Sequence, residues 1–344
     1  MEKKIGIGII GASGYGAGEL LRLLVNHPDV DVVSLVSRTP SPITDLHPHL
    51  LGFYDLNCES ELNIDALKNY EQQVVFSALP HGISAKTISA LLANYSQPNF
   101  HIIDLSGDFR LSNPEQHSKF YPESPLCEDI RSKFCYGLPE LIGSSVISKA
   151  QHISNPGCYA TACILSVAPL IGKCHGSVFF NACSGTSGAG RNPTQTTHHP
   201  EMSTNITAYK VLQHRHEPEI QQEIGSELPC SFVPHLVPIA RGIYVTTHIE
   251  LNEFIALENI VELYKEFYAN KRFIRLRSTP PQLEHVVGSN FCDISIEVRD
   301  RRVIVMCAID NLVKGMAGQA IQNMNLICGL KEDTALSFPP SGLI

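Results

Sequence analysis

The segment from residue 5 to residue 24 restricts the fold of this chain more than any other. Residues 5–10 form the apolar run Ile-Gly-Ile-Gly-Ile-Ile, residues 11–18 are rich in glycine, and residues 19–24 have the apolar spacing of a helix. A strand, a glycine-rich turn and a helix in this order make the first unit of a dinucleotide-binding fold, where a pyrophosphate approaches the backbone at the helix N-terminus. The segment therefore predicts nucleotide binding, and the alternative is a turn with a purely structural role.

Further strand-like runs lie at residues 31–36, 74–79 and 101–105, and a helical pattern at residues 83–92 separates the last two. This alternation indicates a parallel, doubly wound α/β sheet of the Rossmann type. Such sheets bind their ligands at the carboxyl ends of the strands. We therefore expect the loops at residues 80–82 and 104–110 to lie at a cofactor crevice.

The end of the second strand indicates which dinucleotide is bound. Asp31 has roughly the spacing of the acid that holds the ribose of NAD, but it begins its strand rather than ending it. Ser37 and Arg38 stand at the carboxyl end, where a hydroxyl and a cation suit the 2′-phosphate of NADP. The sequence favours NADP over NAD, and the alternative for Arg38 is a solvated charge at the strand end.

The chain has 344 residues, a length that suggests two domains of ordinary size. After about residue 150 strand-like patches alternate less regularly with helices, at residues 177–181, 242–247, 291–296 and 302–306. This pattern predicts an α+β domain with a mostly antiparallel sheet and helices on one face. Residues 313–329 have the apolar spacing of a helix.

Composition narrows the class of protein. The formal net charge is −8 and no long run of Lys or Arg is present, which argues against nucleic acid or an anionic membrane as a partner. The N-terminus leads straight into a strand, and no stretch approaches the roughly 20 apolar residues of a membrane-spanning helix. We therefore expect a cytoplasmic protein. The 11 cysteines include no Cys-x-x-Cys pair, so neither a disulfide framework nor a structural zinc site is expected.

Cys158 differs from the other cysteines in its position. It follows Asn155-Pro156-Gly157 and opens the apolar helical run of residues 161–168. A thiol at a helix N-terminus lies at the positive end of the helix dipole, which stabilises the thiolate. Cys158 is therefore a candidate nucleophile, although its spacing alone equally allows a buried structural cysteine.

Residues 214–216 are His-Arg-His, and Pro218 suits an early helical position, which would leave both histidines on the preceding loop. A loop histidine held by a helix is a candidate general acid and base. Metal binding is the alternative, but the sequence offers no evident third ligand.

Residues 183–191 follow a predicted strand and contain Ser187, Gly188 and Arg191. Backbone amides, hydroxyls and an arginine are suited to a departing phosphate or to the amide of a nicotinamide. The alternative is a flexible surface loop.

Together these motifs resemble the N-acetyl-gamma-glutamyl-phosphate reductases, a family related in fold and chemistry to the aspartate-semialdehyde dehydrogenases. The Asn-Pro-Gly-Cys-Tyr segment at residues 155–159 is the most specific match. Other matches fall nearly from end to end, within residues 11–15, 37–38, 79–82, 104–110, 136–140, 187–191, 214–216, 234–242 and 310–320. The resemblance implies an NADP-binding domain of residues 1–150 completed by the C-terminal helix of 313–344, and a catalytic and dimerisation domain of residues 151–312.

The resemblance also implies roles for particular residues. It makes Cys158 the nucleophile and His216 the acid and base. The residues that it places on NADP are Gly11, Ser13, Gly14, Tyr15, Ser37, Arg38, Pro80, His81, Ser187, Gly188 and Asn311. His81 is equally consistent with a structural loop residue. Arg110 and Arg191 are candidates for a substrate carboxylate or phosphate, since an arginine fork suits either group, and Glu219 is a further candidate for substrate binding.

Two positions depart from the family pattern. Gly16-Ala17-Gly18 stands where the family often has Thr-Gly-Ala, so the sequence does not settle which backbone amide meets the pyrophosphate. Ala240 replaces a frequent Asn before Arg241, which leaves the substrate contacts at that point open.

The chemistry and the resemblance together predict the reduction of N-acetylglutamyl 5-phosphate to its semialdehyde, a step of arginine biosynthesis. The Cys158 thiolate attacks the acyl carbonyl, phosphate leaves, NADPH reduces the thioester and His216 moves the proton. Alternative substrates are aspartyl phosphate and N-acetyl-aminoadipyl phosphate. A non-catalytic NADP-binding regulator is a remote alternative, because such a protein would be expected to lose Cys158 or His216. The family further implies a homotetramer or homodimer.

Overall fold

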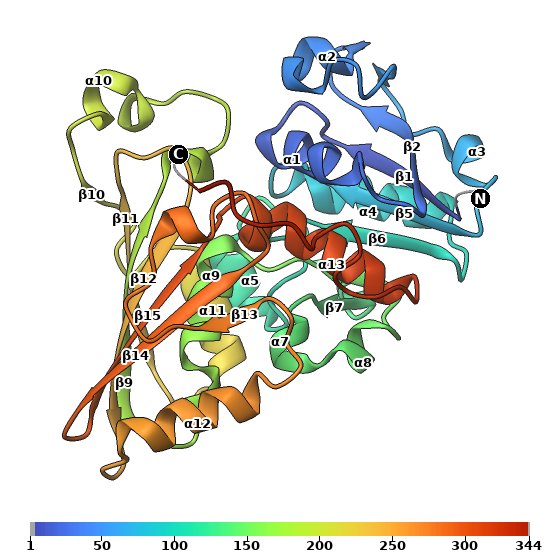
Figure 1. The fold of residues 1–344 in the computed structure, drawn as a ribbon. Coiled ribbons are helices and arrows are strands. Elements are labelled where there is room, and N and C mark those ends of the chain that lie inside the picture. The colour runs from blue at the N-terminus through green and yellow to red at the C-terminus, as the bar shows by residue number, and fades with distance from the viewer. Residues whose placement is uncertain (1–3, 343–344) are drawn as a thin grey trace. The chain divides into compact units, whose positions relative to one another are not determined.

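The computed structural model of the protein describes residues 4–342. It contains two compact units (Figure 1). The first comprises Met1–Pro156 and Met316–Ser337, and the second comprises Gly157–Gly315 and Phe338–Ile344.

The first unit is built on an eight-stranded sheet, which confirms the Rossmann-type α/β fold. Its strands lie in the order β3-β4-β2-β1-β5-β6-β8-β7. They are β1 (Ile5–Ile10), β2 (Val30–Val36), β3 (Ser41–Pro42), β4 (Asn57–Glu59), β5 (Gln72–Ser77), β6 (Phe100–Asp104), β7 (Phe134–Tyr136) and β8 (His152–Ser154). All neighbouring pairs are parallel except β3 and β4 at the edge.

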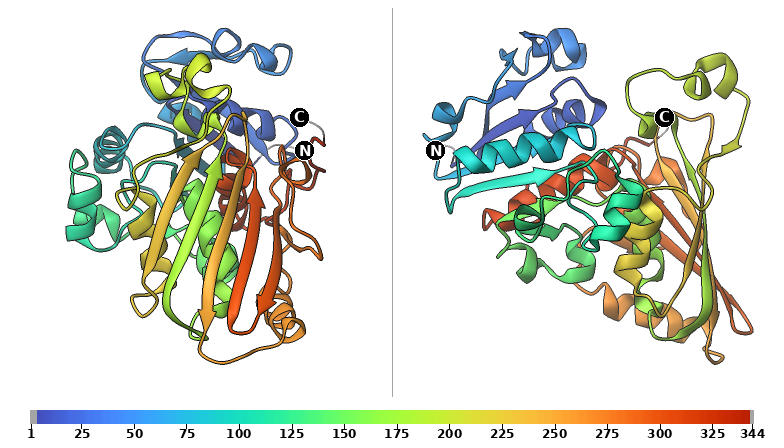
Figure 2. Two further views of the ribbon diagram at one scale, coloured as in Figure 1. Left: turned by 90° about the vertical axis from the view of Figure 1, so that its left-hand side faces the viewer. Right: turned by 180° about the vertical axis from the view of Figure 1, so that it is seen from behind.

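Helices cover both faces of this sheet. The two long ones near the chain start are α1 (Tyr15–Leu24) and α4 (Ile83–Asn94). Shorter ones are α2 (Ile43–Leu46), α3 (Ile64–Leu67), α5 (Pro114–Phe120), α6 (Glu128–Arg131), α7 (Pro139–Ile142) and α8 (Ser144–Ile147). α4 buries Ala85 and Ile88 against Val75, Phe100 and Ile102 of the sheet. It faces the viewer in the right-hand view of Figure 2.

The C-terminal part of the chain adds α13 (Gly318–Ile327) to this unit, where it packs against α1 and β6. The expected helix differs from the observed one at both ends. It begins as a π-helical turn, Val313–Ala317, and it ends at Ile327, so residues 328–342 are not helical. Residues 343 and 344 of the expected segment lie outside the described part. The side chain of Asn323 donates to the Gly137 carbonyl, 2.9 Å away. A Cβ atom at position 137 would clash with the Asn323 side-chain nitrogen, so a glycine is needed there.

The second unit contains a seven-stranded sheet in the order β10-β11-β9-β12-β15-β14-β13. Its strands are β9 (Cys174–Ser184), β10 (Thr207–Ala208), β11 (Cys230–Leu236), β12 (Ile243–Leu251), β13 (Ile274–Leu276), β14 (Cys292–Arg299) and β15 (Arg302–Ile309). The expectation of a mostly antiparallel sheet needs one refinement, because the sheet is mixed: β11 pairs with β9, and β13 with β14, in parallel. Neighbouring parallel strands need a crossover connection, and α11 (His216–Ile224) lies in the connection from β9 to β11.

The central helix of the second unit is α9 (Cys158–Val167). Every residue from Tyr159 to Val167 is buried, and the helix packs against β12, β15 and α11. A helix that is apolar all round belongs in the interior of a protein. The other helices are α10 (His199–Met202) and α12 (Leu257–Phe267). The opposite face of the sheet is largely uncovered in the left-hand view of Figure 2.

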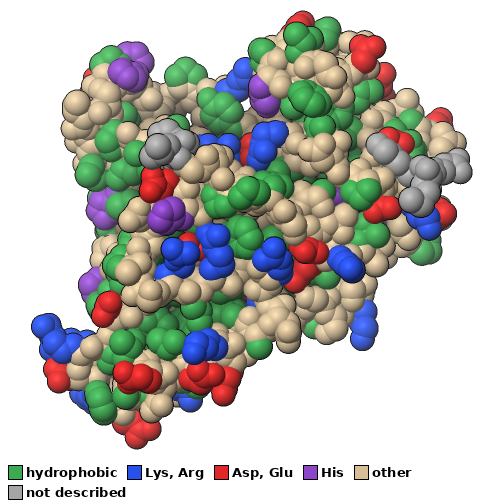
Figure 3. Space-filling model, viewed as in Figure 1, with side chains coloured by type: hydrophobic (Ala, Val, Ile, Leu, Met, Phe, Trp, Pro, Cys, Tyr) green, Lys and Arg blue, Asp and Glu red, His purple; other side chains and the backbone are tan. Residues whose placement is uncertain are grey.

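Charged side chains of both signs are interspersed with apolar ones on the face shown in Figure 3. No helix within residues 4–342 is long and apolar enough to cross a membrane.

Candidate active site

The glycine-rich turn between β1 and α1 has the conformation that a nucleotide-binding turn requires. Gly11 has a φ of +88°, and a Cβ atom there would lie 2.7 Å from the Ala78 carbonyl oxygen, so only glycine fits. Gly14 is the N-cap of α1 and contributes no side-chain cap. Tyr15, the first residue of α1, is 42% exposed. The first amides of a helix have no intrahelical acceptor, so this N-terminus suits an anion.

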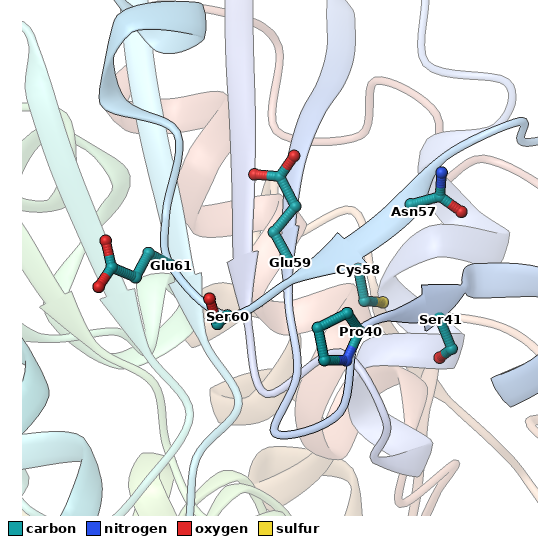
Figure 4. Close-up of a pocket in the computed structure, with 7 residues that line it drawn as sticks. All are labelled: Pro40, Ser41, Asn57, Cys58, Glu59, Ser60 and Glu61. Atoms are coloured by element: carbon teal, nitrogen blue, oxygen red, sulfur yellow. The ribbon is translucent and has the colours of Figure 1, made fainter.

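The second predicted cofactor contact lies at the end of β2. The Ser37 amide donates to the Glu59 carbonyl, its hydroxyl donates to the Thr39 carbonyl, and Arg38 is exposed. Beside them is an open hollow of about 620 Å³ lined by Pro40, Ser41, Asn57, Cys58, Glu59, Ser60 and Glu61 (Figure 4). Asp31 instead accepts from the Tyr70 hydroxyl near the start of the strand. The hydroxyl and cation thus stand at the carboxyl end, where a nucleotide ribose would lie.

The loops after β5 and β6 are tied together. Asp108, which is fully buried, accepts from the Gly82 and Ala85 amides and so caps α4 from a separate segment. His81 accepts the Gly107 amide on Nδ1 at 2.7 Å, and it follows Pro80. This bond gives His81 a structural role in the loop. Burial also raises the pKa of Asp104, at the end of β6, to about 6.

Arg110, a predicted substrate residue, is buried among backbone carbonyls. Its Nε donates to the Asn155 carbonyl at 2.8 Å, and one terminal nitrogen donates to the Leu105 carbonyl at 2.9 Å. These bonds hold the segment that leads to the Pro-Gly-Cys motif. The two bonds tie the guanidinium to the loops, so Arg110 contributes to the shape of this region.

In the second unit, Cys158 is the first residue of α9, as the sequence predicted. A Cβ atom on Gly315 would lie 2.7 Å from the Cys158 Cβ, so a glycine is needed beside the thiol. The helix dipole favours negative charge at this position. Burial raises the pKa of Cys174 to about 11 and that of Cys230 and Cys328 to about 12, so these thiols stay protonated near pH 7.

His216 lies against the residue that precedes Cys158. A Cβ atom on Gly157 would lie 2.7 Å from both Cδ2 and Cε1 of His216, and Nε2 is also in contact. The structure corrects one detail of the expectation: His214 precedes α11, but His216 is its first residue, so it is not on the loop. The helix start fixes the backbone of His216 more firmly than a loop would.

Glu219 stands one turn further along α11 and is fully buried. Its Oε1 accepts the Gly157 amide at 2.7 Å. A carboxylate at a helix N-terminus is favourable for the helix dipole. Glu219 therefore joins α11 to the start of α9, a role that the sequence did not suggest.

A cluster of rings surrounds His216. Nδ1 of His214 accepts the His216 amide at 3.1 Å, and the two imidazole centroids are 4.7 Å apart. Tyr159 and Tyr209 each pack edge-on against His214 at 5.6 Å. Burial, with Lys210 and Arg215 as lesser causes, lowers the pKa of His214 to about 3, so this imidazole stays neutral.

Two tyrosines that the sequence did not single out form a hydroxyl chain. Tyr209 donates to the Tyr159 hydroxyl at 3.2 Å, and Tyr159 donates to the His235 carbonyl at 3.2 Å. Burial raises the pKa of Tyr209 to about 12. The Gly-Cys-Tyr order placed Tyr159 next to the candidate nucleophile, which was the only signal available for it.

The loop after β9 forms a short 3-10 helix, Thr186–Ala189, that contains Ser187 and Gly188. Asn311 holds this loop: its Nδ2 donates to the Ser187 hydroxyl at 2.9 Å, and its Oδ1 accepts the Gly242 amide at 2.7 Å. Arg191 is exposed after the helix. The predicted residues Ser187 and Asn311 are thus bonded to each other.

Cys158 and the His216 ring thus both lie at the start of α9, an arrangement suited to covalent chemistry with an acid and base. Across the part of the chain that the structure describes, no group of three or more His, Cys, Asp or Glu side chains could hold a metal ion. Each of the eleven cysteines is a free thiol.

Comparison with known proteins agrees with both halves of this description. Residues 6–150 match the family described as semialdehyde dehydrogenase, NAD binding domain, and residues 158–311 match semialdehyde dehydrogenase, dimerisation domain. An aspartate semialdehyde dehydrogenase II structure from Vibrio cholerae, in complex with ASA, aligns with a TM-score of 0.71 at 14% identity, covering 95% of this chain and 99% of that one. The fold and the family models define the class of the semialdehyde dehydrogenases.

The sequence relatives are more specific. An N-acetyl-gamma-glutamyl-phosphate reductase of Methanosarcina barkeri is 44% identical over 96% of this chain and 98% of the relative. The enzyme of the same name from Methanoregula boonei is 41% identical over 97% and 98%. The chain belongs to the family of N-acetyl-gamma-glutamyl-phosphate reductases.

Proposed function

We propose that this protein reduces N-acetyl-L-glutamyl 5-phosphate to N-acetyl-L-glutamate 5-semialdehyde with NADPH, releasing phosphate, in arginine biosynthesis. The observation that carries the proposal is the start of α9, where Cys158 follows a glycine on which the His216 ring lies. The names of the curated relatives supply the substrate.

In the first half of the reaction, the Cys158 thiolate forms a bond to the acyl carbon. The bond from that carbon to the phosphate oxygen breaks, and inorganic phosphate leaves a thioester on the protein. The dipole of α9 supports the thiolate, and Glu219 holds the Gly157 amide so that the helix start is fixed.

In the second half, reduction of the thioester leaves an oxyanion, which protonated His216 converts to a hemithioacetal. His216 then takes this hydroxyl proton back as the C–S bond breaks to give the aldehyde, and Cys158 leaves as the thiolate that began the reaction. When bound, NADPH supplies the hydride for the reduction of the thioester. The glycine turn with Gly11, and the Ser37–Arg38 pair, fit its pyrophosphate and 2′-phosphate.

The substrate assignment is tested in the oxidative direction. The protein is supplied with NADP, phosphate and either N-acetylglutamate semialdehyde or aspartate semialdehyde, and NADPH formation is followed by absorbance. We expect turnover of the first and at least about a hundredfold lower kcat/KM for the second, since its chain is shorter and lacks the acetyl group. Equal or better use of aspartate semialdehyde would move the proposal to that substrate.

We further propose that the protein is a homo-oligomer whose subunits pair through the uncovered face of the second sheet. Phe179 stands in the middle of β9 on that face and is 51% exposed. The family model that matches residues 158–311 is described as a dimerisation domain, and an exposed Phe179 fits a face that another chain covers. Light scattering on the intact protein distinguishes dimer from tetramer, and F179D is expected to weaken the assembly without unfolding the subunit.

Eleven free thiols suit a reducing compartment. We therefore propose the cytoplasm as the site of the reaction, which cell fractionation checks.

A further inference from the structure

A second histidine lies on a glycine, this time in the first unit. His47 follows α2 and is 4% exposed. A Cβ atom on Gly18 would lie 2.6 Å from Nδ1 and 2.7 Å from Cε1 of this imidazole. Gly18 belongs to the first turn of α1, so the Nδ1–Cε1 edge of the ring packs against the start of this helix.

The same imidazole is hydrogen-bonded to the glycine turn. His47 Nε2 donates to the Ala12 carbonyl oxygen at 2.7 Å. One side chain thus spans the turn and the helix, and it comes from a segment that is remote in sequence from both. This contact also explains why the chain has a glycine at position 18, where the family pattern differs.

The bond to Ala12 determines the orientation of a whole peptide unit. The peptide between Ala12 and Ser13 is trans, as are all the peptide bonds that the structure describes. In a planar trans peptide the C=O and the next N–H point in opposite directions. A carbonyl held toward His47 therefore turns the Ser13 amide away from His47.

We propose that His47 is a positioning residue for the pyrophosphate of NADP(H): it fixes the Ala12–Ser13 peptide and the first turn of α1 in the orientation that presents their amides. This inference rests on the cofactor of the proposed function. His47 packs against Gly18, donates to the Ala12 carbonyl and meets the His49 ring edge-on, with centroids 5.8 Å apart, so it acts on the cofactor through the turn.

The test is direct binding of NADPH to the cofactor-free protein, followed by NADPH fluorescence. Loss of one buried hydrogen bond to the turn in H47L should weaken NADPH binding about tenfold. H47Q, whose amide can still donate to the Ala12 carbonyl, should remain within about threefold of the unaltered protein. H175L is the matched control, because His175 is an exposed histidine of the second unit and its replacement should leave binding unchanged.

A second probe separates positioning from general loss of structure. Adenosine 2′-monophosphate carries the ribose phosphate but no pyrophosphate. Its affinity for H47L, measured by displacement of NADPH, should therefore equal its affinity for the unaltered protein. In turnover assays, KM for NADPH should rise in H47L while kcat and KM for the acyl phosphate stay within about twofold.

Unchanged NADPH binding by H47L would overturn the inference, as would an equal loss of NADPH and adenosine 2′-monophosphate binding. If the unaltered protein fails to bind NADPH, the proposed function itself fails. These outcomes are therefore distinguishable.

Discussion

The two units each place a histidine ring on a glycine at the start of a helix, and the two contacts serve different ends. In the first unit His47 lies on Gly18 of α1 and bonds to a backbone carbonyl. In the second unit His216 lies on Gly157 before α9, next to the candidate nucleophile.

The difference shows that the two units contribute different kinds of groups, the first to ligand binding and the second to the proposed reaction. The first unit offers backbone amides to a ligand, so a side chain matters there by shaping the turn. In the proposed reaction the second unit offers side chains that make and break bonds, so a displaced His216 ring should lower the rate of the chemical step directly. Equivalent changes in the two units should therefore alter different kinetic constants.

The largest effect is expected from removing the nucleophile. C158S should lower kcat at least about a thousandfold, because a serine hydroxyl is a far weaker nucleophile near neutral pH. NADPH binding by fluorescence should be unchanged, because exchanging sulfur for oxygen at Cys158 alters none of the residues assigned to the cofactor. The control C127S replaces a half-buried thiol of the first unit and should keep full activity. Full phosphate-dependent turnover by C158S would rule out the thioester route.

The next largest effect should come from G157A. The added methyl group would meet the His216 ring, which has to move, and a displacement of about 1 Å costs roughly a hundredfold in rate. We expect that loss in kcat with an unchanged Kd for NADPH. A variant that loses NADPH affinity instead would show that the two contacts are not separate in function.

G18A is the counterpart in the first unit and should have a smaller effect. Its methyl group would push His47 off the helix and loosen the bond to the Ala12 carbonyl. We expect about a tenfold rise in Kd for NADPH, with kcat at saturating NADPH within about twofold. A drop in kcat at constant Kd would contradict the division of roles.

The smallest effect concerns the pH dependence of the second unit. His214 has a folded pKa of about 3 against an ordinary value of 6.5, so its neutral form contributes stability above pH 6.5 that is lost as the pH falls toward 3. H214N keeps an acceptor for the His216 amide but cannot take up this proton. The drop in Tm between pH 7.5 and pH 5 should be smaller in H214N by about 2 °C.

The control for that measurement is H199N, which changes an exposed histidine of α10. Its Tm should fall with pH as in the unaltered protein. An identical fall in H214N would show that His214 does not carry this part of the acid sensitivity.

The local parts of this molecule follow from its sequence. The strand, turn and helix of residues 5–24 are encoded by adjacent residues, and Cys158 stands where the apolar helical pattern begins. A run of strands with helices between them likewise predicts the first sheet, since such connections are short and regular. For these features the neighbouring residues supply most of the information.

The rest depends on contacts between distant segments. The bond from the Gly157 amide to Glu219 joins residues 62 positions apart, and nothing near either residue announces it. His47 is one of 15 histidines, with no local pattern that marks its bond to Ala12. The π-helical turn at Val313–Ala317 escaped prediction because its apolar spacing also suits an ordinary helix.

The parallel pairing of β9 with β11 affects the order in which the parts of the candidate active site form during folding. Paired residues such as Val178 and Cys230 lie far apart in the chain, and a long connection has to close before they meet, whereas α9 is a local helix. During synthesis or refolding, we expect the thiol of Cys158 to be in place before α11 delivers its imidazole. For that interval the proposed nucleophile lacks its proposed proton partner and is open to oxidation to a sulfenic acid. A reducing compartment would then protect the enzyme most while it is still incomplete.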